Sequence, residues 1–339
     1  MEQLGIRMVE RGHDVTVDCR AGHYADRISS YRGMRLRYLP AIQQKHLETI
    51  SHTALSALSI DRSSAVICMG VGNAPIVRAL EISGKLCVFN VDGADWQRDK
   101  WGPIARWYLQ RCENLAARAH SLVIADAEAV QQYYRVEYGR QTELVPYGAE
   151  APADRGTGAL DRFGISPGSY ALFVGRLVPE NGAHDFLEGI RLAKLNSHAV
   201  VVGDAPFERA YVERLRETAP LGSIFTGYQF GIPYQQLTTH ARVFVLAASV
   251  GGTHPVLLEQ MAAGNCVLAR DTASNREVLG QAGILWNSPA ELADGLLVSW
   301  QDAKLRRRLG QAAKERAAAR YSWDVVTDRY LELCEASLG

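Results

Sequence analysis

The segment from Gly251 to Gly264, GGTHPVLLEQMAAG, has the residue types of an anion-binding helix start. Pro255 suits the first turn of a helix and Gly264 suits its end. The first amides of such a helix have no partner within it and lie at the positive end of its dipole. Glu259 follows about one helical turn after Pro255. Amides for phosphate oxygens and a carboxylate for ribose hydroxyls suit a nucleoside diphosphate, whereas the glycines alone favour an ordinary strand-loop-helix turn.

The segment 251–264 must be positioned by the surrounding fold, and the sequence shows short apolar runs that alternate with helical patterns. A first set lies at residues 13–20, 34–40, 64–70, 85–91, 121–126 and 142–148, and a second set at 170–175, 198–203, 222–227, 241–247, 265–269 and 283–286. Between them, residues 149–169 are rich in Ala, Pro, Gly, Asp and Ser and are expected to link two domains. Such alternation predicts an α/β fold of two doubly wound parallel-sheet halves. We place them at 1–150 and 165–320, followed by a C-terminal helix at 321–339.

The chain opens directly on a helical pattern, EQLGIRMVERGH. A doubly wound domain normally begins with a buried strand and a glycine-rich turn into its first helix. We therefore expect the first strand of the N-terminal half to be missing. Either the start is truncated or this domain lacks a central strand.

Composition limits the kind of protein. In 339 residues, Lys plus Arg and Asp plus Glu number 37 each, so no overall basic field favours nucleic acid as a partner. Cys68, Cys87 and Cys266 lie in apolar runs, where a thiol packs as a small hydrophobic group, and this usage is typical of a reducing compartment. No apolar run approaches the roughly 20 residues of a membrane span. We predict a cytoplasmic protein.

A series of motifs along the chain resembles a known family. They are RGHDVTVDCR at 11–20, KHLETISHT at 45–53, GVGNAP at 70–75, VDGADWQRDKWG at 91–102, VPYGAE at 145–150, FVGRLVPENG at 173–182, VVGDAP at 201–206, FTGYQFG at 225–231 and GGTHPVLLEQMAAG at 251–264. In this order they resemble family 4 retaining glycosyltransferases of the GT-B fold, which has two Rossmann-like domains facing a cleft. The most similar members are rhamnosyltransferase-like enzymes of bacterial surface polysaccharide synthesis.

The resemblance implies that the second half binds a nucleotide-sugar donor. Gly175 and Arg176 end a predicted strand, where a guanidinium can make two hydrogen bonds to a diphosphate; a surface salt bridge is the alternative. A lysine usually follows in this loop of the family, but here the position is Asn181. Phosphate neutralisation would then depend more on Arg176 and on the amides that precede the helix: those of Gly252, Thr253 and His254.

The family also has two glutamates eight positions apart. The second matches Glu259, and the first is replaced here by Gly251. Because that first glutamate ordinarily contacts the donor sugar, sugar recognition must be carried differently. The backbone amides of Gly251 and Gly252, or the side chain of His254, are the candidates.

The first half is expected to hold the acceptor. Its loop VDGADWQRDKW, at 91–101, follows a predicted strand and combines Asp92 and Asp95 with Trp96. Tryptophan faces suit sugar rings and carboxylates bind hydroxyls. The alternative is that one aspartate caps a helix and the tryptophans lie in the core.

The helix predicted at 103–120 carries Arg106, Arg111 and Arg118 beside Trp107 and Tyr108. Such a face could rest on anionic lipid, which would fit a lipid-linked acceptor. The alternative, which the pattern favours, is that the helix covers its own sheet.

Together these features predict sugar transfer from a dTDP- or UDP-sugar, with rhamnose as a candidate, to a saccharide acceptor that is lipid-linked. Arg176, Glu259 and Asp92 form the expected catalytic set. No metal or other cofactor is expected, because Arg176 and the helix start near Pro255 can stabilise the departing diphosphate and no Asp-x-Asp motif is present. Two rival interpretations are a nucleotide-sugar 2-epimerase and a non-catalytic sugar-nucleotide-binding assembly subunit.

Overall fold

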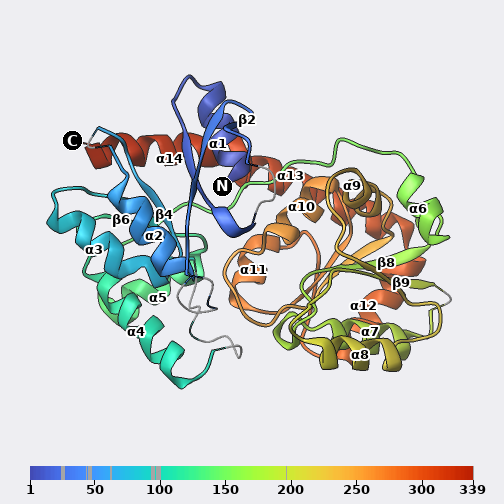
Figure 1. Cartoon of the computed structure of the whole chain (residues 1–339). Coiled ribbons are helices and arrows are strands. Elements are labelled where there is room, and N and C mark those ends of the chain that lie inside the picture. Colours follow the sequence, from blue (N-terminus) through green and yellow to red (C-terminus); the bar gives the residue numbers. More distant parts are fainter. Residues whose placement is uncertain are drawn as a thin grey trace. The chain divides into compact units, whose positions relative to one another are not determined.

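The computed structural model describes residues 1–23, 27–42, 44, 48–61, 63–92, 96, 101–195 and 197–338 (Figure 1). The chain divides into two compact units. One comprises Met1–Pro146 with Trp323–Gly339, and the other comprises Tyr147–Ser322. Both units are built from parallel strands and crossover helices, which confirms the predicted α/β class.

The second unit contains one six-stranded parallel sheet in the order β10-β9-β8-β11-β12-β13. Its strands are β8 (Tyr170–Val174), β9 (His198–Val202), β10 (Ile224–Gly227), β11 (Val243–Leu246), β12 (Val267–Arg270) and β13 (Ile284–Trp286). From β8 the chain continues outward to β9 and β10 and then returns to the other side of β8 as β11. The strand order therefore reverses between β8 and β11, and ligands of doubly wound sheets bind outside the carboxyl ends of the strands at such a point.

Helices cover both faces of this sheet. They are α6 (Gly158–Phe163), α7 (Ala183–Ala193), α8 (Arg209–Thr218), α9 (Gly231–Thr239), α10 (Pro255–Ala263), α11 (Ala273–Leu279), α12 (Pro289–Gln301) and α13 (Ala303–Arg320). Alternate residues of each strand enter different cores, as the pleat requires. Phe173 belongs to the core that includes residues of α7, α8 and α12, whereas Leu172 belongs to the core that includes residues of α6, α9, α10, α11 and α13. Figure 1 shows α7, α8 and α12 together on one side of β8 and β9.

The segment predicted as a link, 149–169, is partly structured. It contains α6, whose Leu160 is completely buried in the same core as Leu237 of α9. Gln236 of α9 accepts a hydrogen bond from the Ala159 amide at 2.7 Å. Composition alone did not reveal this docking, because the apolar residues of so short a helix are too few to show a period.

The first unit has two hydrogen-bonded sheets instead of one. Strands β4 (Ile67–Met69), β5 (Val88–Asn90), β6 (Leu122–Ala125) and β7 (Glu143–Leu144) form a parallel sheet in that order. A separate sheet has the order β1-β3-β2, in which β1 (Thr16–Arg20) runs parallel to β3 (Met34–Leu39), and β2 (Ser30–Tyr31) pairs antiparallel with β3. Within the described residues, no backbone ladder joins β1 to β4.

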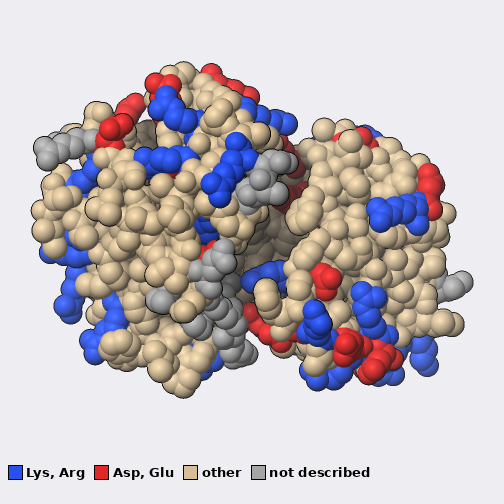
Figure 2. Space-filling model, in the orientation of Figure 1, with Lys and Arg blue, Asp and Glu red and all other residues tan. Residues whose placement is uncertain are grey.

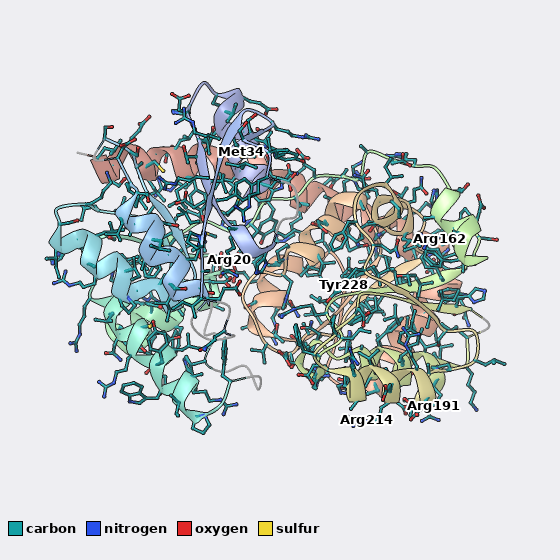
Figure 3. The ribbon with its side chains drawn as sticks, in the orientation of Figure 1. Arg20, Met34, Arg162, Arg191, Arg214 and Tyr228 are labelled. Carbon is teal, nitrogen blue, oxygen red and sulfur yellow. The ribbon has the colours of Figure 1, made fainter. Side chains whose placement is uncertain are left out.

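The α-helices in the described part of the first unit are α1 (Glu2–Glu10), α2 (Glu48–Leu58), α3 (Ala74–Ile82), α4 (Pro103–Ala117), α5 (Glu128–Tyr138) and α14 (Trp323–Leu338). Helices α3, α4 and α5 pack on the face of the four-stranded sheet that carries Phe89. Helices α1 and α14 cover the opposite face, which carries Val88 and Ile124. Gly5 of α1 lies so close to Met34 that a Cβ atom there would be 2.4 Å from its sulfur (Figure 3).

The C-terminal helix α14 is thus part of the first unit, although the preceding helix α13 belongs to the second. Asn90 at the end of β5 donates from Nδ2 to the Tyr330 hydroxyl of α14 at 2.9 Å. Arg11, the C-cap residue of α1, pairs with Asp324 and Asp328 of α14. These contacts join the first and last segments of the chain around one sheet.

Cys68, Cys87 and Cys266 are buried in the cores, as predicted for small hydrophobic groups. Acidic and basic side chains are interspersed over the visible surface in Figure 2, in keeping with the equal counts of the two signs. None of the helices in the described ranges combines the length and apolar character that crossing a bilayer requires.

Candidate active site

Glycines follow directly on the ends of β8 and β9, and Gly227 ends β10. They allow the backbones to approach closely at the carboxyl edge of the second unit's sheet. The Gly175 amide donates to the Val202 carbonyl at 3.0 Å, and the Gly203 amide donates to the Gly227 carbonyl at 2.9 Å. Gly203 has φ 138°, and a Cβ atom there would lie 1.9 Å from the Gly175 carbonyl oxygen. This edge is consequently lined by backbone.

Arg176 lies at the start of the loop after β8, at the point where the strand order reverses. Its side chain is exposed and makes no hydrogen bond or ion pair with any residue that the structure describes. Asn181, in the short helix Pro179–Asn181 of the same loop, donates from Nδ2 to the Arg176 carbonyl at 2.8 Å. Asn181 therefore stabilises the loop backbone, and the guanidinium of Arg176 is available to an anion.

The loop after β11 is joined to the loop after β8. The Ser249 amide donates to the Glu180 carbonyl at 3.0 Å. Gly182, with φ 69°, approaches Ala247 so closely that a Cβ atom would lie 2.4 Å from its carbonyl oxygen. These contacts join the predicted motif at 173–182 to the loop that leads into the predicted motif at 251–264.

Helix α10 begins at Pro255 and is followed by Gly264 as its C-cap residue, with φ 78°; both positions agree with the prediction. His254 occupies the N-cap position, but its side chain does not cap the helix amides. Gly251 has φ 139°, and a Cβ atom there would lie 2.9 Å from the His254 ring. The Ser274 hydroxyl donates to the Gly251 carbonyl at 3.2 Å, which anchors the glycine hinge to α11. Gly252 is half-buried and Thr253 is buried at the same hinge.

Glu259 lies in the second turn of α10 and faces α9. Its Oε2 atom accepts a hydrogen bond from the Tyr234 hydroxyl, in the first turn of α9. Burial raises the pKa of the Glu259 carboxyl, and the hydrogen bond from Tyr234 opposes part of that rise. Tyr234 was missed by the sequence analysis, because its contact with Glu259 depends on how α9 packs against α10.

An aromatic pair stands at the same edge, after β10. The rings of Tyr228 and Phe230 stack with centroids 6.0 Å apart and an angle of 21°. The Tyr228 hydroxyl donates to the Asp204 carbonyl at 2.8 Å in the loop after β9 (Figure 3). Both residues are exposed, Tyr228 at 46% and Phe230 at 77%.

In the first unit, Asp92 follows β5. Its φ of 62° is a backbone conformation that residues other than glycine rarely adopt. Its amide donates to Oδ1 of Asn90 at 2.8 Å, and the same Asn90 donates to Tyr330. Buried Asn90 therefore stabilises the backbone that presents Asp92. The predicted partner Asp95 lies outside the described residues.

Trp96 is directed toward its own unit's core. Its indole Nε1 donates to Oε2 of Glu113 at 3.1 Å, and the hydroxyls of Tyr133 and Tyr138 donate to the same oxygen, each at 3.1 Å. Glu113 is completely buried. This arrangement agrees with the alternative in which the tryptophan belongs to the core, and it uses the polar edge of the indole for structure.

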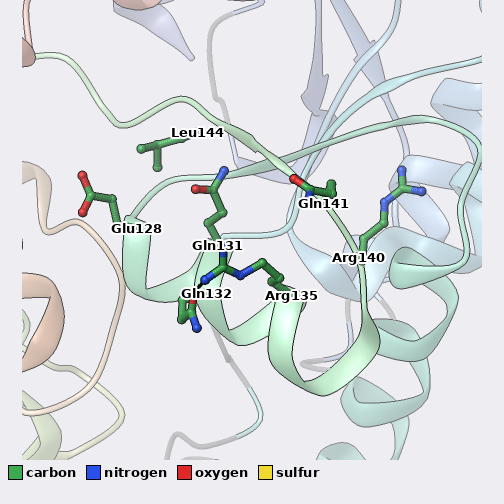
Figure 4. Close-up of a pocket in the computed structure, with 7 residues that line it drawn as sticks. All are labelled: Glu128, Gln131, Gln132, Arg135, Arg140, Gln141 and Leu144. Carbon is green, nitrogen blue, oxygen red and sulfur yellow. Dashed lines mark hydrogen bonds between the residues drawn. The ribbon is translucent and has the colours of Figure 1, made fainter.

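A polar cavity of about 380 Å³ lies elsewhere in the first unit, around α5 and β7 (Figure 4). Seven residues line it: Glu128, Gln131, Gln132, Arg135, Arg140, Gln141 and Leu144. Arg140 donates to the Ser121 carbonyl, and Gln131 donates to the Thr142 carbonyl. Several of its polar groups thus serve the fold, and none of the predicted site residues lies in this cavity.

Comparisons with known proteins find sequences similar to both units. Residues 168–302 match a family model described as glycosyl transferases group 1, and residues 71–150 match a domain of unknown function, DUF1972. The chain is 27% identical to phosphatidyl-myo-inositol mannosyltransferase of Mycobacterium tuberculosis, over 99% of this chain and 92% of the relative.

Solved structures share the whole architecture. Sucrose-phosphate synthase of Thermosynechococcus elongatus has a TM-score of 0.80 at 18% identity, over 98% of this chain and 91% of that one. HepE of Anabaena, solved in complex with UDP-glucose, has a TM-score of 0.74 at 18% identity, over 90% and 87% of the two chains. The protein therefore has the GT-B fold, and its residues 168–302 are similar to the group 1 glycosyl transferases.

Proposed function

We propose that the protein transfers a sugar from a nucleoside diphosphate donor to a saccharide acceptor. The observation that carries this proposal is the junction of the loops after β8 and β11 at the strand-order reversal. Arg176, which has no side-chain partner among the described residues, and the start of α10 both lie there. An exposed guanidinium and a helix N-terminus both bind phosphate oxygens. The UDP-glucose complex of the similarly folded HepE is consistent with this assignment.

The proposed chemistry uses charge stabilisation. As the bond between the sugar and the diphosphate breaks, negative charge grows on the leaving group. Arg176 and the amides before Pro255 are already in place to stabilise it, without reorganisation during the reaction. In the retaining reaction that we propose, the acceptor hydroxyl approaches the face from which the diphosphate leaves, and a phosphate oxygen takes its proton. Glu259 binds the nucleotide ribose.

The acceptor is proposed to bind to the first unit, at the loop that begins with Asp92. The mycobacterial relative acts on a phosphatidyl-inositol lipid, as its name states, which supports a lipid-linked acceptor. We propose assembly of a bacterial surface polysaccharide as the setting and rhamnose as the first donor sugar to assay. Gly251 has no side chain at the position where the resembled family has a glutamate. The donor sugar would therefore be recognised by the backbone amides of Gly251 and Gly252 or by the side chain of His254.

A lipid-linked acceptor would favour contact with a membrane surface, and α4 offers a suitable face. Ile104 is 85% exposed and Trp107 is 58% exposed, while Arg111 lies over the Trp107 ring at 5.6 Å. Tyr108 is directed inward and donates to the Gly72 carbonyl at 2.8 Å. An exposed apolar and cationic stripe of this kind suits the interface of anionic lipid. Such an association would be peripheral.

The test is nucleotide binding by calorimetry, together with sugar transfer from dTDP- and UDP-sugars to lipid-linked saccharides. Arg176→Ala should weaken nucleotide binding by about 1.5–3 kcal/mol, the value of a charge-assisted hydrogen bond. Arg214→Ala is the matched control, because Arg214 is another exposed arginine of the same unit. Equal affinity of both variants and the unmodified protein would refute the site.

One rival function has a specific observation in its favour. Asn181 stands where the resembled family has a lysine, and its amide is engaged with the Arg176 carbonyl. A protein with fewer cations at the diphosphate could bind a sugar nucleotide without transferring the sugar. Tight nucleotide binding with no transfer to any acceptor would support that assembly role. Release of an isomerised sugar without acceptor would instead indicate an epimerase.

A further inference from the structure

Two sequence motifs of the first unit, at 11–20 and 45–53, meet in the structure. Arg20, labelled in Figure 3, is the last residue of the first motif and of β1. Glu48 and Thr49 belong to the second motif and begin α2. The Arg20 guanidinium lies 3.6 Å from Oε2 of Glu48 and donates to the Thr49 hydroxyl at 3.0 Å. Neither motif contributes to the donor site described above.

His23 joins these residues from the short helix that directly follows β1. Its Nε2 atom hydrogen-bonds to Oε1 of Glu48, and its side chain is 53% exposed. Because Arg20 ends β1, these contacts place all four residues at the carboxyl edge of the sheet that β1 forms with β3. Ligands of doubly wound sheets bind outside that edge. We call Arg20, His23, Glu48 and Thr49 the His23 cluster.

The His23 cluster offers one hydrogen-bond acceptor and one donor to a ligand. A carboxylate only accepts hydrogen bonds, so the Nε2 atom of His23 carries the hydrogen in its contact with Glu48. The Nδ1 atom of the neutral ring is then an acceptor, and it has no hydrogen-bond partner among the described residues. Thr49 is exposed and its oxygen accepts from Arg20, so its own hydrogen can be donated to a ligand.

This combination suits a neutral ligand that carries hydroxyl groups. The positive charge of Arg20 and the negative charge of Glu48 offset each other, so the cluster presents no net charge that would select an anion or a cation. A hydroxyl donates one hydrogen bond and accepts others, so neighbouring hydroxyls of a sugar can contact an acceptor and a donor at once. The chemistry of the cluster therefore favours a saccharide.

We propose that the His23 cluster binds the saccharide of the acceptor, with a sugar hydroxyl donating to Nδ1 of His23. This inference rests on the proposed function, and it gives the acceptor a second contact region besides the loop that begins with Asp92. Glu48 is a positioning residue, because its hydrogen bond fixes which ring nitrogen of His23 carries the hydrogen. Arg20 in turn holds the Glu48 carboxylate.

Two substitutions of His23 separate the roles of its ring nitrogens. Asparagine keeps a hydrogen-bonding atom near the position of Nδ1, and glutamine keeps one near the position of Nε2. The assay measures sugar transfer to undecaprenyl-diphosphate-linked N-acetylglucosamine, glucose and galactose. His23→Gln should raise the acceptor KM about tenfold, the effect of one lost hydrogen bond, and His23→Asn should raise it by less than about threefold. The donor KM should change in neither variant.

The positioning role of Glu48 is tested by a second pair of substitutions. Glu48→Ala should raise the acceptor KM about fivefold, because the His23 ring loses its orientation. Glu48→Gln should restore the wild-type value, because a glutamine oxygen still accepts from Nε2. His13→Ala is the matched control, since His13 is another exposed histidine of the first unit and precedes β1.

An acceptor KM of His23→Gln equal to that of the wild-type protein would overturn this inference, and so would an equal rise of the donor KM. Retention of activity in His23→Gln with loss in His23→Asn would show that His23 only holds Glu48, which also overturns it. If melting temperatures show that the His23 variants do not fold, an acceptor KM unchanged in Glu48→Ala overturns it instead. No transfer by the wild-type protein to any of the three lipid-linked saccharides would overturn the proposed function, and this inference with it.

Discussion

The carboxyl ends of the strands in the two units are stabilised in different ways. In the second unit, neighbouring loops approach through glycines and backbone hydrogen bonds, and the exposed Arg176 has no described partner. In the first unit, polar side chains near the strand ends are engaged with each other, as Trp96 is with buried Glu113 and Asn90 is with Tyr330. A rigid backbone edge leaves side chains available to a ligand, whereas a side-chain network uses them for the fold.

The strongest test of this comparison is to replace one glycine by alanine at the carboxyl edge of the sheet in each unit. Gly203 and Gly70 both follow a strand directly and both have positive φ, 138° and 86°. A Cβ atom at Gly203 would collide with the Gly175 carbonyl, whereas nothing lies within 4 Å of one at Gly70. Gly203→Ala should destabilise the protein by about 3 kcal/mol or more, and Gly70→Ala by about 1 kcal/mol, the cost of backbone strain alone. Urea unfolding measures both, and equal losses would contradict the comparison.

The side-chain network of the first unit can be tested at Glu113. Its Oε2 atom accepts three hydrogen bonds, from Trp96, Tyr133 and Tyr138. Glu113→Gln would place a neutral amide among these donors and should destabilise the protein by about 2 kcal/mol, as for a hydrogen-bonded buried charge. Thermal unfolding checks this, with exposed Glu137→Gln as the control. Nucleotide affinity should not change. A loss of affinity equal to that of Arg176→Ala would contradict the comparison, because it would show that the side-chain network of the first unit also serves nucleotide binding.

A smaller effect is expected where α14 meets the first unit. Tyr330→Phe removes the acceptor of the Asn90 amide and should cost about 1 kcal/mol, the net value of one hydrogen bond. Because Asn90 also accepts from the Asp92 amide, sugar transfer should fall more than nucleotide affinity does. Kinetics and calorimetry on the same preparation separate the two. A parallel fall in both quantities would assign the Asp92 loop to the donor.

The smallest effect is a pH dependence that belongs to Glu259. Burial raises the pKa of this carboxyl in the folded state above its unfolded value, so the folded state binds the proton more tightly. The contribution to stability is therefore present below the unfolded pKa and is lost as the pH rises through the folded pKa. Glu259→Gln should stabilise the protein slightly at pH 8 relative to wild type, and less so at pH 4. Melting temperatures across this range would test the sign.

Much of the second unit could be predicted from local pattern. The apolar run at 170–175 contains β8, and the glycine, proline and glycine around 251–264 correctly bounded α10. Such signals are short-range, because helix ends and buried strands depend on residues within a few positions. The division of the first unit into two sheets could not be predicted in this way, because strand pairing joins residues far apart in the sequence.

In the candidate site too, local sequence pattern identified individual residues but not their contacts. The sequence by itself identified Arg176 and Glu259 as groups beside a strand end and a helix start, because each is flanked by its own local signal. Only the tertiary structure decided what those groups touch: Asn181 supports the loop backbone, Trp96 donates to Glu113, and Tyr234 engages Glu259. The physical reason is that a hydrogen bond between two helices or between a loop and a helix depends on packing, and packing is a property of the assembled core rather than of any one segment.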